Sequence, residues 1–353
     1  MTPSVEIYRD APPDGWDGIV TSLGGDVFHS HAWARYQVDI SATSAVYLLA
    51  RDDRKEPVGV AVTLVHQSRT PLLAALVRDL TFAAHPLARG NADEPVSALL
   101  REGEAFARRL GVARLWLGSF GSGRSPIRPA TRGFRETERI EFVADLTAGI
   151  DSVWQVIDKK QRERIRQLER KGIAVTPESG RDALDTLQAL RGSTQQKRAA
   201  RGQGYSLAMG RELDDAIDRH LLQGNLARIF VARAEGTPIA AILYTVFAGR
   251  AYSMFSGSSG EGYRLGAQSL LYWRAVQHFC EQGFVELNRG GGPGAAASPD
   301  HPLHGIYQFK LRLGTTPLVC RSGVKVLSPL RAAIADLKNR VAGHGGGEAV
   351  EGD

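Results

Sequence analysis

Residues 228–242, which read RIFVARAEGTPIAAI, contain the pattern that decides the fold of this chain. An apolar segment, a polar turn and a second apolar segment follow one another, and this order predicts two strands joined by a turn. Residues 46–61, which read VYLLARDDRKEPVGVA, have the same pattern in the first half of the chain. The two stretches therefore indicate an internal repeat.

Two further elements recur in the same order after each strand pair. Residues 104–115 read as a helix that a glycine stops and a strand continues, and residues 275–287 read in the same way. Residues 132–134 and 313–315 each place a glycine before a second apolar segment. Chance resemblance is common among strand-turn-strand patterns, but three elements in one order favour an ancient duplication. We therefore expect two copies of one α/β unit.

Length and composition agree with a globular protein of two units. With 353 residues the chain exceeds the roughly 250 residues at which single cores stop growing. Its 43% of hydrophobic and 23% of charged residues are close to the globular average. No apolar run approaches the ~18 residues of a membrane helix, and the first residues lack a signal-peptide pattern. We expect a soluble, cytoplasmic protein, with a Gly-rich, acidic and disordered tail at 342–353.

The cysteines and histidines do not have the spacing of a metal site. Cys280 and Cys320 provide neither a disulfide framework nor a ligand set. The histidines show no His-x-x-x-His spacing, so no structural or catalytic metal is predicted. The formal charge of +6 and the pI near 9.4 favour anionic partners such as nucleotides, phosphorylated carriers or RNA.

Much of the positive charge is concentrated on a helix predicted to begin at Asp151 and to end at Gly172. Four apolar residues form its inward stripe: Val153, Ile157, Ile165 and Leu168. Its other face carries more cations than anions, with Lys159, Lys160, Arg162, Arg164, Arg166, Arg170 and Lys171 against Asp158, Glu163 and Glu169. Such a run is often a solvated helix face, but this surplus also suits a phosphate backbone.

The segment 304–314 (HGIYQFKLRLG) places a Phe-Lys pair on a short predicted helix that ends at a glycine. Ile306, Phe309 and Leu313 fall at helical spacing and are expected to pack inward, so that Lys310 projects from the flank of this stripe. A lone lysine on an amphipathic helix is more often an ordinary surface residue. A cation fixed in this way can instead stabilise negative charge that develops during a reaction.

The order of elements resembles the GNAT acyltransferase unit. Each copy begins with helices, continues through antiparallel-looking strands and ends with a helix and further strands. The resemblance implies an α/β fold with mixed α+β sheets, made of two tandem GNAT-like acyltransferase domains. The first is expected to comprise residues 1–148 with 317–341, and the second residues 149–316.

Four motifs resemble the FemABX-type aminoacyl-tRNA-dependent peptidyltransferases, and the resemblance extends over nearly the whole chain. The motifs are the basic helix with its end at 159–173, the segments 251–259 and 266–273, and the segment 305–314. This family looks like two fused GNAT units and includes enzymes that add bridge amino acids to peptidoglycan precursors. Together the four motifs are far more specific than any one of them.

The family resemblance implies roles for particular residues. Phe309 would shape the reaction pocket, and Lys310 would assist the attack of an amine on an aminoacyl ester, either as a fixed charge, which we favour, or by relaying a proton. Trp33 and Arg35 match an early family motif that contacts the phosphates of the precursor, and Tyr252 matches a tyrosine that lines the acceptor groove. The resemblance places tRNA on the basic helix, at Lys159, Lys160, Arg162 and Arg166.

Several features depart from the family pattern or have a simpler explanation. The region between Gly172 and Leu226 has room only for ordinary helices, so the chain resembles a short type without the family's helical arm. Arg201 and Tyr205 match the acceptor contacts of the family only loosely. The loop 261–267 resembles the pyrophosphate-binding loop of GNAT enzymes but lacks an arginine in register. In addition, Arg35 can be explained as an ordinary helix-surface residue, and Tyr252 as a tyrosine of a strand packed in the core.

The activity implied by the resemblance is transfer of an aminoacyl group from charged tRNA to an amine of a peptide-bearing acceptor. That acceptor would be a peptidoglycan precursor or a peptide-like natural product, linked to a nucleotide or a lipid. No cofactor is expected, because the ester is already activated. A monomer or weak dimer without integral membrane association is expected. Two alternatives stay open, an acyl-coenzyme A-dependent N-acyltransferase acting on an amino sugar or polysaccharide precursor, and a non-catalytic RNA- or nucleotide-binding protein.

Overall fold

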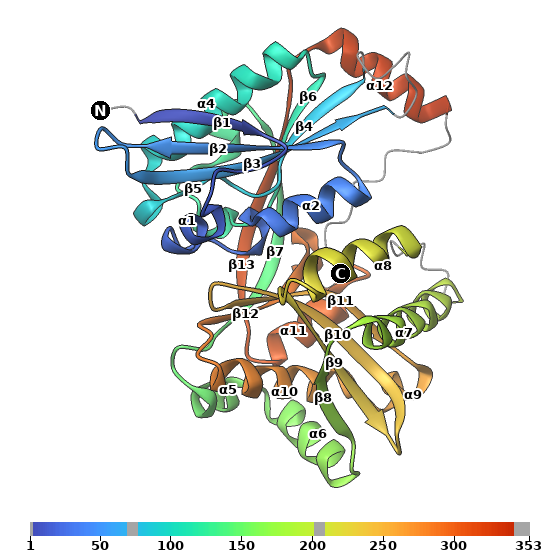
Figure 1. Ribbon diagram of the computed structural model, residues 1–353. Coiled ribbons are helices and arrows are strands. Elements are labelled where there is room, and N and C mark those ends of the chain that lie inside the picture. The colour runs from blue at the N-terminus through green and yellow to red at the C-terminus, as the bar shows by residue number, and fades with distance from the viewer. Residues whose placement is uncertain (1–2, 69–76, 201–208, 342–353) are drawn as a thin grey trace. The chain divides into compact units, whose positions relative to one another are not determined.

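The computed structural model describes residues 3–68, 77–200 and 209–341, and these form two compact units (Figure 1). Unit 2 comprises residues 140–318, and unit 1 comprises the described residues before and after it. The sequence had suggested exchange points at 148/149 and 316/317. The tail expected at 342–353 lies outside the described residues.

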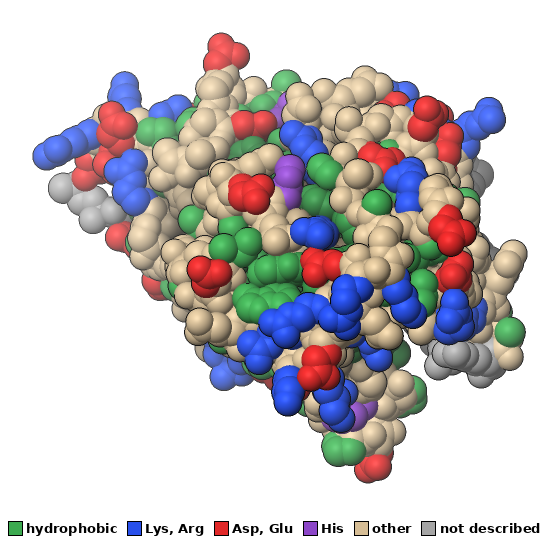
Figure 2. All heavy atoms as spheres, turned by 90° about the horizontal axis from the view of Figure 1, so that it is seen from below, with side chains coloured by type: hydrophobic (Ala, Val, Ile, Leu, Met, Phe, Trp, Pro, Cys, Tyr) green, Lys and Arg blue, Asp and Glu red, His purple; other side chains and the backbone are tan. Residues whose placement is uncertain are grey.

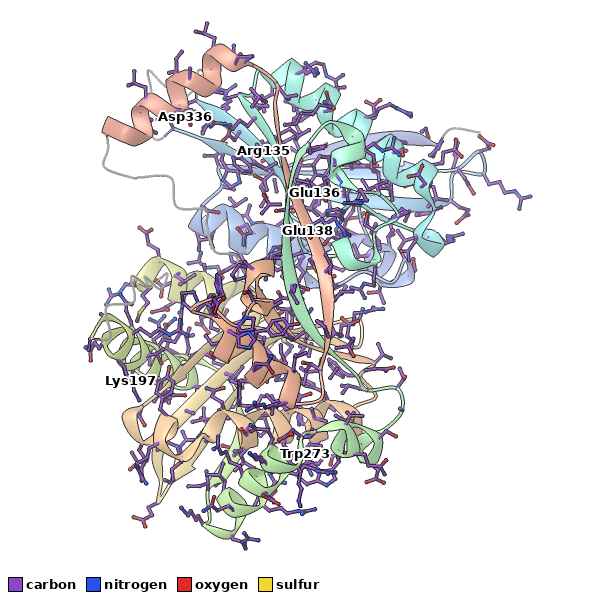
Figure 3. The ribbon with its side chains drawn as sticks, turned by 180° about the vertical axis from the view of Figure 1, so that it is seen from behind. Arg135, Glu136, Glu138, Lys197, Trp273 and Asp336 are labelled. Carbon is purple, nitrogen blue, oxygen red and sulfur yellow. The ribbon has the colours of Figure 1, made fainter. Side chains whose placement is uncertain are left out.

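Two long strands contribute residues to both units. They are β7 (Arg135–Asp145) and β13 (Thr316–Val326). After β13 the chain remains in unit 1, where it ends the described part with helix α12 (Pro329–Val341). Within unit 1, β13 and β7 are joined by ion pairs from Arg321 to Glu136 (Nε to Oε1, 3.4 Å) and to Glu138 (Nη2 to Oε1, 3.0 Å). Figure 3 labels both glutamates on β7.

Unit 1 is built on a sheet with the strand order β1-β2-β3-β4-β6-β13. Its neighbouring strands are antiparallel except β4 and β6, which run parallel. The strands besides β13 are β1 (Ser4–Arg9), β2 (Ser44–Arg51), β3 (Pro57–Gln67), β4 (Arg78–Phe82) and β6 (Arg114–Leu117), and β5 (Leu87–Ala88) pairs with β3. The helices besides α12 are α1 (Trp16–Ser22), α2 (His31–Ile40) and α4 (Asp93–Leu110), with 3-10 turns at Val27–His29, Arg89–Asn91, Ser122–Arg124 and Pro129–Arg132.

Helix α4 covers the sheet of unit 1 and shows why this sequence forms a helix there. Acidic residues occupy its first turn and basic residues its last, which suits the helix dipole. Its apolar stripe, which includes Leu99 and Phe106, packs with Leu48 and Phe82 of the strands in one buried core. The helix ends at Gly111, whose φ of 67° is a left-handed conformation that favours glycine.

Unit 2 repeats this plan with the strand order β7-β12-β11-β10-β9-β8. Strands β8 to β11 pair antiparallel, and β11 and β12 run parallel. The strands besides β7 are β8 (Ala174–Glu178), β9 (Ala227–Ala234), β10 (Thr237–Phe247), β11 (Arg250–Ser258) and β12 (Glu286–Pro293). The helices are α5 (Ile150–Val156), α6 (Lys159–Arg170), α7 (Arg181–Ala199), α8 (Arg211–Ile217) with a π-helical turn at Asp218–Leu222, α9 (Gly260–Leu265), α10 (Ala267–Glu281) and α11 (His304–Arg312), and Gly294–Ala297 forms a 3-10 turn.

The two units confirm the repeat that the sequence predicts. The stretches 46–61 and 228–242 form the strand pairs β2–β3 and β9–β10. Helix α4 leads into β6, which pairs parallel with β4, and α10 leads into β12, which pairs parallel with β11. The fold is therefore a mixed α/β fold in which one arrangement occurs twice.

The predicted basic helix is two helices instead of one. Helix α5 ends at Val156, and α6 begins after Asp158, whose carboxylate accepts a hydrogen bond from the backbone N–H of Lys160 at 2.9 Å. The apolar stripe is nevertheless buried as expected, because Ile165 and Leu168 of α6 pack with Val153 of α5 in the core of unit 2. Trp154 of α5 also packs against Trp273 of α10, with ring centroids 4.5 Å apart, and Figure 3 labels Trp273.

Candidate functional site

Lys310 is the buried residue of helix α11. Only 7% of this residue is exposed, whereas Ile306 on the same helix is 40% exposed. The sequence-based expectation that Ile306 packs inward is therefore wrong, although Leu313 is fully buried and Phe309 packs partly against the core of unit 2. The helix turns its lysine, and not its isoleucine, toward the protein interior.

The ammonium group of Lys310 lies between a carbonyl and an aromatic ring. Its Nζ donates a hydrogen bond to the carbonyl oxygen of Gly291 at 3.2 Å and lies 5.4 Å from the centroid of the Phe142 ring. Both contacts favour a charged amine. The Thr315 hydroxyl donates to the carbonyl of Lys310 at 2.8 Å and thereby holds the end of the helix. The position of the cation is therefore determined by strands β7 and β12 as well as by its own helix.

A buried carboxylate lies next to Phe142 in the sequence. Glu141 is 4% exposed and accepts hydrogen bonds from the Tyr252 hydroxyl at 2.9 Å and from the Asn288 amide at 2.8 Å. Tyr252 and Asn288 are opposite one another in the parallel pair β11–β12, so that both side chains reach the same carboxylate. Tyr252 was predicted as a site residue, while Glu141 and Asn288 were not.

We call Lys310, Gly291, Asn288, Glu141 and Tyr252 the Lys310 site. All five belong to unit 2. Lys310 is hydrogen-bonded to Gly291, and Glu141 is hydrogen-bonded to both Asn288 and Tyr252. Gly291 and Asn288 lie close together on β12. A buried, fixed cation in such surroundings interacts strongly with nearby negative charge, because little water screens it.

A second buried cation follows Asn288 on β12. Arg289 is 6% exposed, donates to the Tyr244 hydroxyl at 3.2 Å and lies over the Tyr272 ring at 4.9 Å. Burial is the main reason that the pKa of each tyrosine is raised, so both phenols remain protonated. The Arg289 Nε has no hydrogen-bond partner among the described residues. The strand that carries Gly291 is thus anchored in a polar as well as an apolar core.

The predicted tRNA-binding residues form an exposed basic surface on α6. Lys159, Lys160 and Arg166 are exposed, and Arg162 is partly buried. Arg166 also lies over the ring of Trp154 at 5.4 Å. Figure 2 views the molecule from the side on which α6 lies in Figure 1 and shows lysine and arginine side chains gathered there. One anion of this helix, Glu169, is already paired with Arg274 of α10, with Oε1 and Nη2 3.0 Å apart.

The other predicted site residues lie in unit 1 or outside the described chain. Trp33 is 2% exposed and packs edge-on against Phe28 with centroids 4.9 Å apart, as a core residue does. Arg35 lies on the same helix and is partly buried. Arg201 and Tyr205 lie outside the described residues. Among residues 3–68, 77–200 and 209–341 there is no cluster of three metal-binding side chains and no helix long and apolar enough to cross a membrane.

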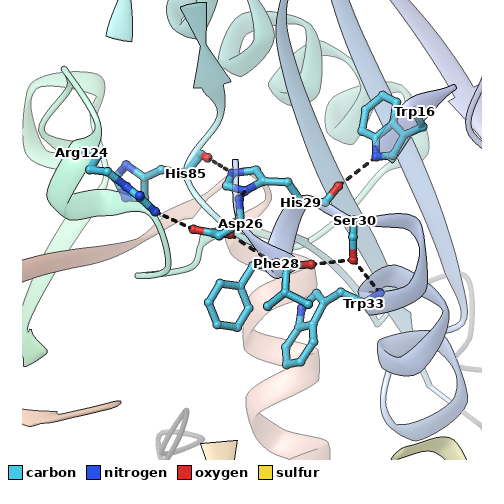
Figure 4. A network of polar contacts seen from close by, with 9 residues as sticks. Trp16, Asp26, Phe28, His29, Ser30, Trp33, His85 and Arg124 are labelled. Atoms are coloured by element: carbon cyan, nitrogen blue, oxygen red, sulfur yellow. Dashed lines mark hydrogen bonds and ion pairs between the residues drawn. The ribbon is translucent and has the colours of Figure 1, made fainter. Parts of the chain in front are cut away.

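Unit 1 contains a buried ionic network that the sequence analysis did not identify (Figure 4). The Asp26 carboxylate contacts the His29 Nδ1 at 2.9 Å and accepts from the Arg124 Nη2 at 3.0 Å. The His29 Nε2 lies 2.9 Å from the carbonyl oxygen of His85, and the His85 Nε2 lies 2.8 Å from that of Arg321. The network joins four separate segments of unit 1.

The charges in this network are mutually dependent. Burial alone would raise the pKa of Asp26, but the charge and hydrogen bond of His29 and the charge of Arg124 lower it to about 2. Burial alone would lower the pKa of His29, but the Asp26 carboxylate raises it above its ordinary value. Burial lowers the pKa of His85 to about 4. Near neutral pH the network therefore holds an ionised Asp26 and a neutral His85, and the Asp26 carboxylate favours the protonated form of His29.

Comparison with known families and structures gives matches at the level of the fold. The family model described as an acetyltransferase (GNAT) domain matches residues 158–298, which lie in unit 2. Comparison with curated proteins gives no match.

Several solved structures resemble nearly the whole chain. The crystal structure of FemX has a TM-score of 0.73 and 13% identity, covering 95% of this chain and 99% of that one. L-PGS from Bacillus licheniformis has a TM-score of 0.56 and 15% identity, covering 96% and 99%. The C-terminal domain of a putative lysylphosphatidylglycerol synthetase from Agrobacterium fabrum has a TM-score of 0.54 and 16% identity, covering 94% and 98%. At these identities the likeness shows a shared fold.

Proposed function

We propose that this chain, which has the tandem GNAT fold that it shares with FemX, is an aminoacyltransferase that uses charged tRNA as donor. The acceptor is an amine of a peptide-bearing molecule, either a peptidoglycan precursor or a peptide-like natural product. The reaction takes place in the cytoplasm, where charged tRNA is found. The observation that carries the proposal is the buried Lys310, fixed by Gly291 and Phe142.

The proposed reaction replaces an ester by an amide. The acceptor nitrogen attacks the ester carbonyl carbon of the aminoacyl-tRNA, and the carbonyl oxygen becomes negatively charged as the C–N bond forms. The C–O bond to the ribose then breaks, and the proton lost by the amine goes to the ribose oxygen. Lys310 stabilises the developing oxyanion, because its charge is already in place and needs no reorganisation. Phe309 and Tyr252 contribute to the pocket around the reacting groups.

Charged tRNA explains why a basic helix lies on the same unit as the Lys310 site. The exposed cations of α6 are suited to bind a polyanion. The Arg164 side chain lies close to Gly266 at the start of α10, because a Cβ built on Gly266 would be 3.0 Å from the Arg164 Nη1. The start of a helix attracts phosphate. Arg164 therefore brings a positive charge to the start of α10, where the segment 261–267, most of which forms α9, has no arginine in register.

The donor and the acceptor are both identified by one assay. The protein is incubated with a pool of aminoacyl-tRNAs labelled in the amino acid and with candidate amine acceptors, and the products are weighed by mass spectrometry. The proposal predicts a product heavier by one aminoacyl residue, and treatment of the tRNA with ribonuclease abolishes it. Product formation that resists ribonuclease would contradict it.

A coenzyme A-dependent N-acyltransferase is the second candidate, because the model of the acetyltransferase (GNAT) domain matches residues 158–298. This candidate also uses an anion site at the start of α10. Acetyl-coenzyme A would then raise the midpoint of thermal unfolding in a concentration-dependent way, and charged tRNA would not be consumed. Under the aminoacyltransferase proposal, acetyl-coenzyme A gives no such shift.

Charge reversal on α6 tests the proposed tRNA surface. We expect Lys159→Glu, Arg162→Glu and Arg166→Glu together to raise the KM for charged tRNA about tenfold or more at low salt, and to flatten its dependence on salt, because each lost phosphate contact removes about one unit of salt slope. The measurement is the KM at several salt concentrations.

The matched control for this experiment carries the same change of net charge in unit 1: Arg54→Glu, Lys55→Glu and Arg101→Glu, all at exposed positions. If the α6 variant and this control have the same KM for tRNA at each salt concentration, α6 does not bind tRNA.

Arg35 is proposed to bind a phosphate of the acceptor. Arg35→Ala is expected to raise the KM for a phosphorylated acceptor about tenfold while kcat changes little, because a binding contact made equally in the ground and transition states is lost. Gln37→Ala, on the same helix, serves as control. An unchanged KM in the Arg35 variant would mean that this arginine does not bind the acceptor phosphate and is only a helix-surface residue.

A further inference from the structure

Asn288 is a buried residue of β12 that is hydrogen-bonded at both ends of its side chain. Its Nδ2 donates to Glu141 at 2.8 Å, and its Oδ1 accepts from the backbone N–H of Gly290 at 2.8 Å. The residue is 5% exposed. The Nδ2 end of the amide therefore faces Glu141, and the Oδ1 end faces the backbone of Gly290.

The second of these bonds shapes the strand at the point where it meets Lys310. Gly290 has a φ of 68°, a conformation that favours glycine, and the hydrogen bond from its N–H to the Asn288 side chain closes this turn. The next residue, Gly291, presents its carbonyl oxygen to the Lys310 Nζ. The Asn288 amide therefore determines where the acceptor for the lysine ammonium lies.

Glu141 is itself held in place from two other strands, β11 and β12. The Tyr252 hydroxyl donates to its Oε1, while Asn288 donates to its Oε2. The chain of contacts then runs from a carboxylate on β7, through the Asn288 amide and the turn at Gly290, to the cation on α11. The links through Glu141, Asn288 and Gly290 are buried, and the last link to Lys310 is partly buried, so a change at Asn288 has few ways to relax.

We propose that Asn288 is a positioning residue that sets the place of the Lys310 ammonium through the turn at Gly290. The inference rests on the proposed function, in which Lys310 stabilises the oxyanion. A displacement of about 1 Å in such a group costs about 100-fold in rate. Asn288 itself touches neither donor nor acceptor.

The substitution Asn288→Asp gives a signature that a merely structural residue would not give. At low pH the new carboxyl is protonated, donates to Glu141 as the amide did, and still accepts from Gly290. As the pH rises, the new carboxyl loses its proton, so that it no longer donates to Glu141 and the two carboxyl groups repel each other. We expect kcat of this variant to approach that of the wild type at low pH and to fall about 100-fold as the pH rises.

The matched control is Asn225→Asp, at an exposed position of unit 2 that makes the same chemical change. Its kcat is expected to follow the wild type throughout. If Asn288→Asp also follows the wild type at every pH, the positioning role is overturned.

A second measurement reports on Lys310 without turnover. Acetic anhydride acetylates free amines, and mass spectrometry gives the rate at Lys310 relative to the exposed Lys171 in the same molecule. In Asn288→Ala we expect this ratio to rise about fivefold or more, because local opening exposes the Lys310 amine to the reagent. An unchanged ratio would contradict the proposed link.

The two measurements separate this inference from the proposed function. A raised acetylation ratio in Asn288→Ala, together with recovery of kcat at low pH in Asn288→Asp, supports both the positioning role and the proposed function. If the wild type transfers no aminoacyl group from any charged tRNA, the proposed function fails, while the acetylation ratio still decides whether Asn288 controls the position of Lys310.

Discussion

Replacement of Lys310 by methionine is expected to lower kcat for aminoacyl transfer about 100- to 1,000-fold, the effect seen when one preorganised oxyanion contact is removed. Methionine is close to the lysine stem in length and is apolar, so the buried position should remain filled and unit 2 should fold. The proposed reaction places the expected loss in kcat and not in the KM for tRNA, because in that reaction the charge stabilises the transition state. Both constants are measured at saturating acceptor.

The control for this experiment is Lys325→Met in unit 1. Lys325 is also a partly buried lysine beside an aromatic ring, with its Nζ 5.7 Å from the centroid of Phe134, and it forms an ion pair with Glu104 at 2.7 Å. Loss of this cation is expected to leave kcat nearly unchanged. If Lys310→Met keeps kcat within about threefold of the wild type, the charge is not part of the reaction.

Replacement of Asp26 by asparagine is expected to lower the free energy of unfolding by about 3 kcal/mol, because removing one partner of a buried ionic network leaves the others without their counter-charge. The carboxylate accepts from Phe28, His29 and Arg124 at once. An asparagine has one acceptor oxygen in place of two, so its N–H would face one of these donors. Urea denaturation at pH 6 measures the loss.

The pH dependence of stability identifies the cause of this loss. The pKa of His29 is raised in the folded state, so its contribution is complete below its unfolded value near 6.5 and is lost as the pH rises through the higher folded value. We expect the wild type to lose stability over this range and Asp26→Asn to lose much less. His85, whose pKa is lowered to about 4, gives the opposite pH dependence, because it lowers the stability as the pH falls from 6.5 toward 4.

A matched control for Asp26→Asn is Asp185→Asn. Asp185 is paired with Arg181 on the surface of α7, with Oδ1 and Nε 2.9 Å apart and 58% of the aspartate side chain exposed. Solvent screens such pairs, so its effect on unfolding should be far smaller. An equal loss in both variants would mean that the network in unit 1 contributes no more than a surface pair.

Repetition along the chain made the fold predictable from sequence. The strand pairs at 46–61 and 228–242 and the helices that precede β6 and β12 carry strong local patterns, and the structure places them as expected. The break between α5 and α6 was missed because Ile157 continues the helical spacing of apolar residues, whereas the N-cap at Asp158 became evident only with its hydrogen bond to Lys160.

The candidate site was less predictable than the fold. The Phe-Lys pair was found from its motif, but helical spacing predicted Ile306 inward and Lys310 at the flank. In the structure Lys310 is buried and Ile306 is exposed, because a carbonyl of β12 and an aromatic ring of β7 contact the ammonium. Glu141 and Asn288 gave no signal, since a polar residue in a strand normally faces water. Their partners are far away in sequence, and only the pairing of β11 and β12 brings them together.

The return of β13 to unit 1 has a consequence for biosynthesis. Strand β6 has β4 on one side and β13 on the other, and β13 leaves the ribosome only after more than half of the chain has followed β6. Synthesis adds about 5 to 20 residues per second, so the edge of β6 that pairs with β13 stays unpaired for about 10 to 40 s. Nascent chains and products of premature termination before residue 316 therefore expose a strand edge that can aggregate, and they are natural clients for chaperones.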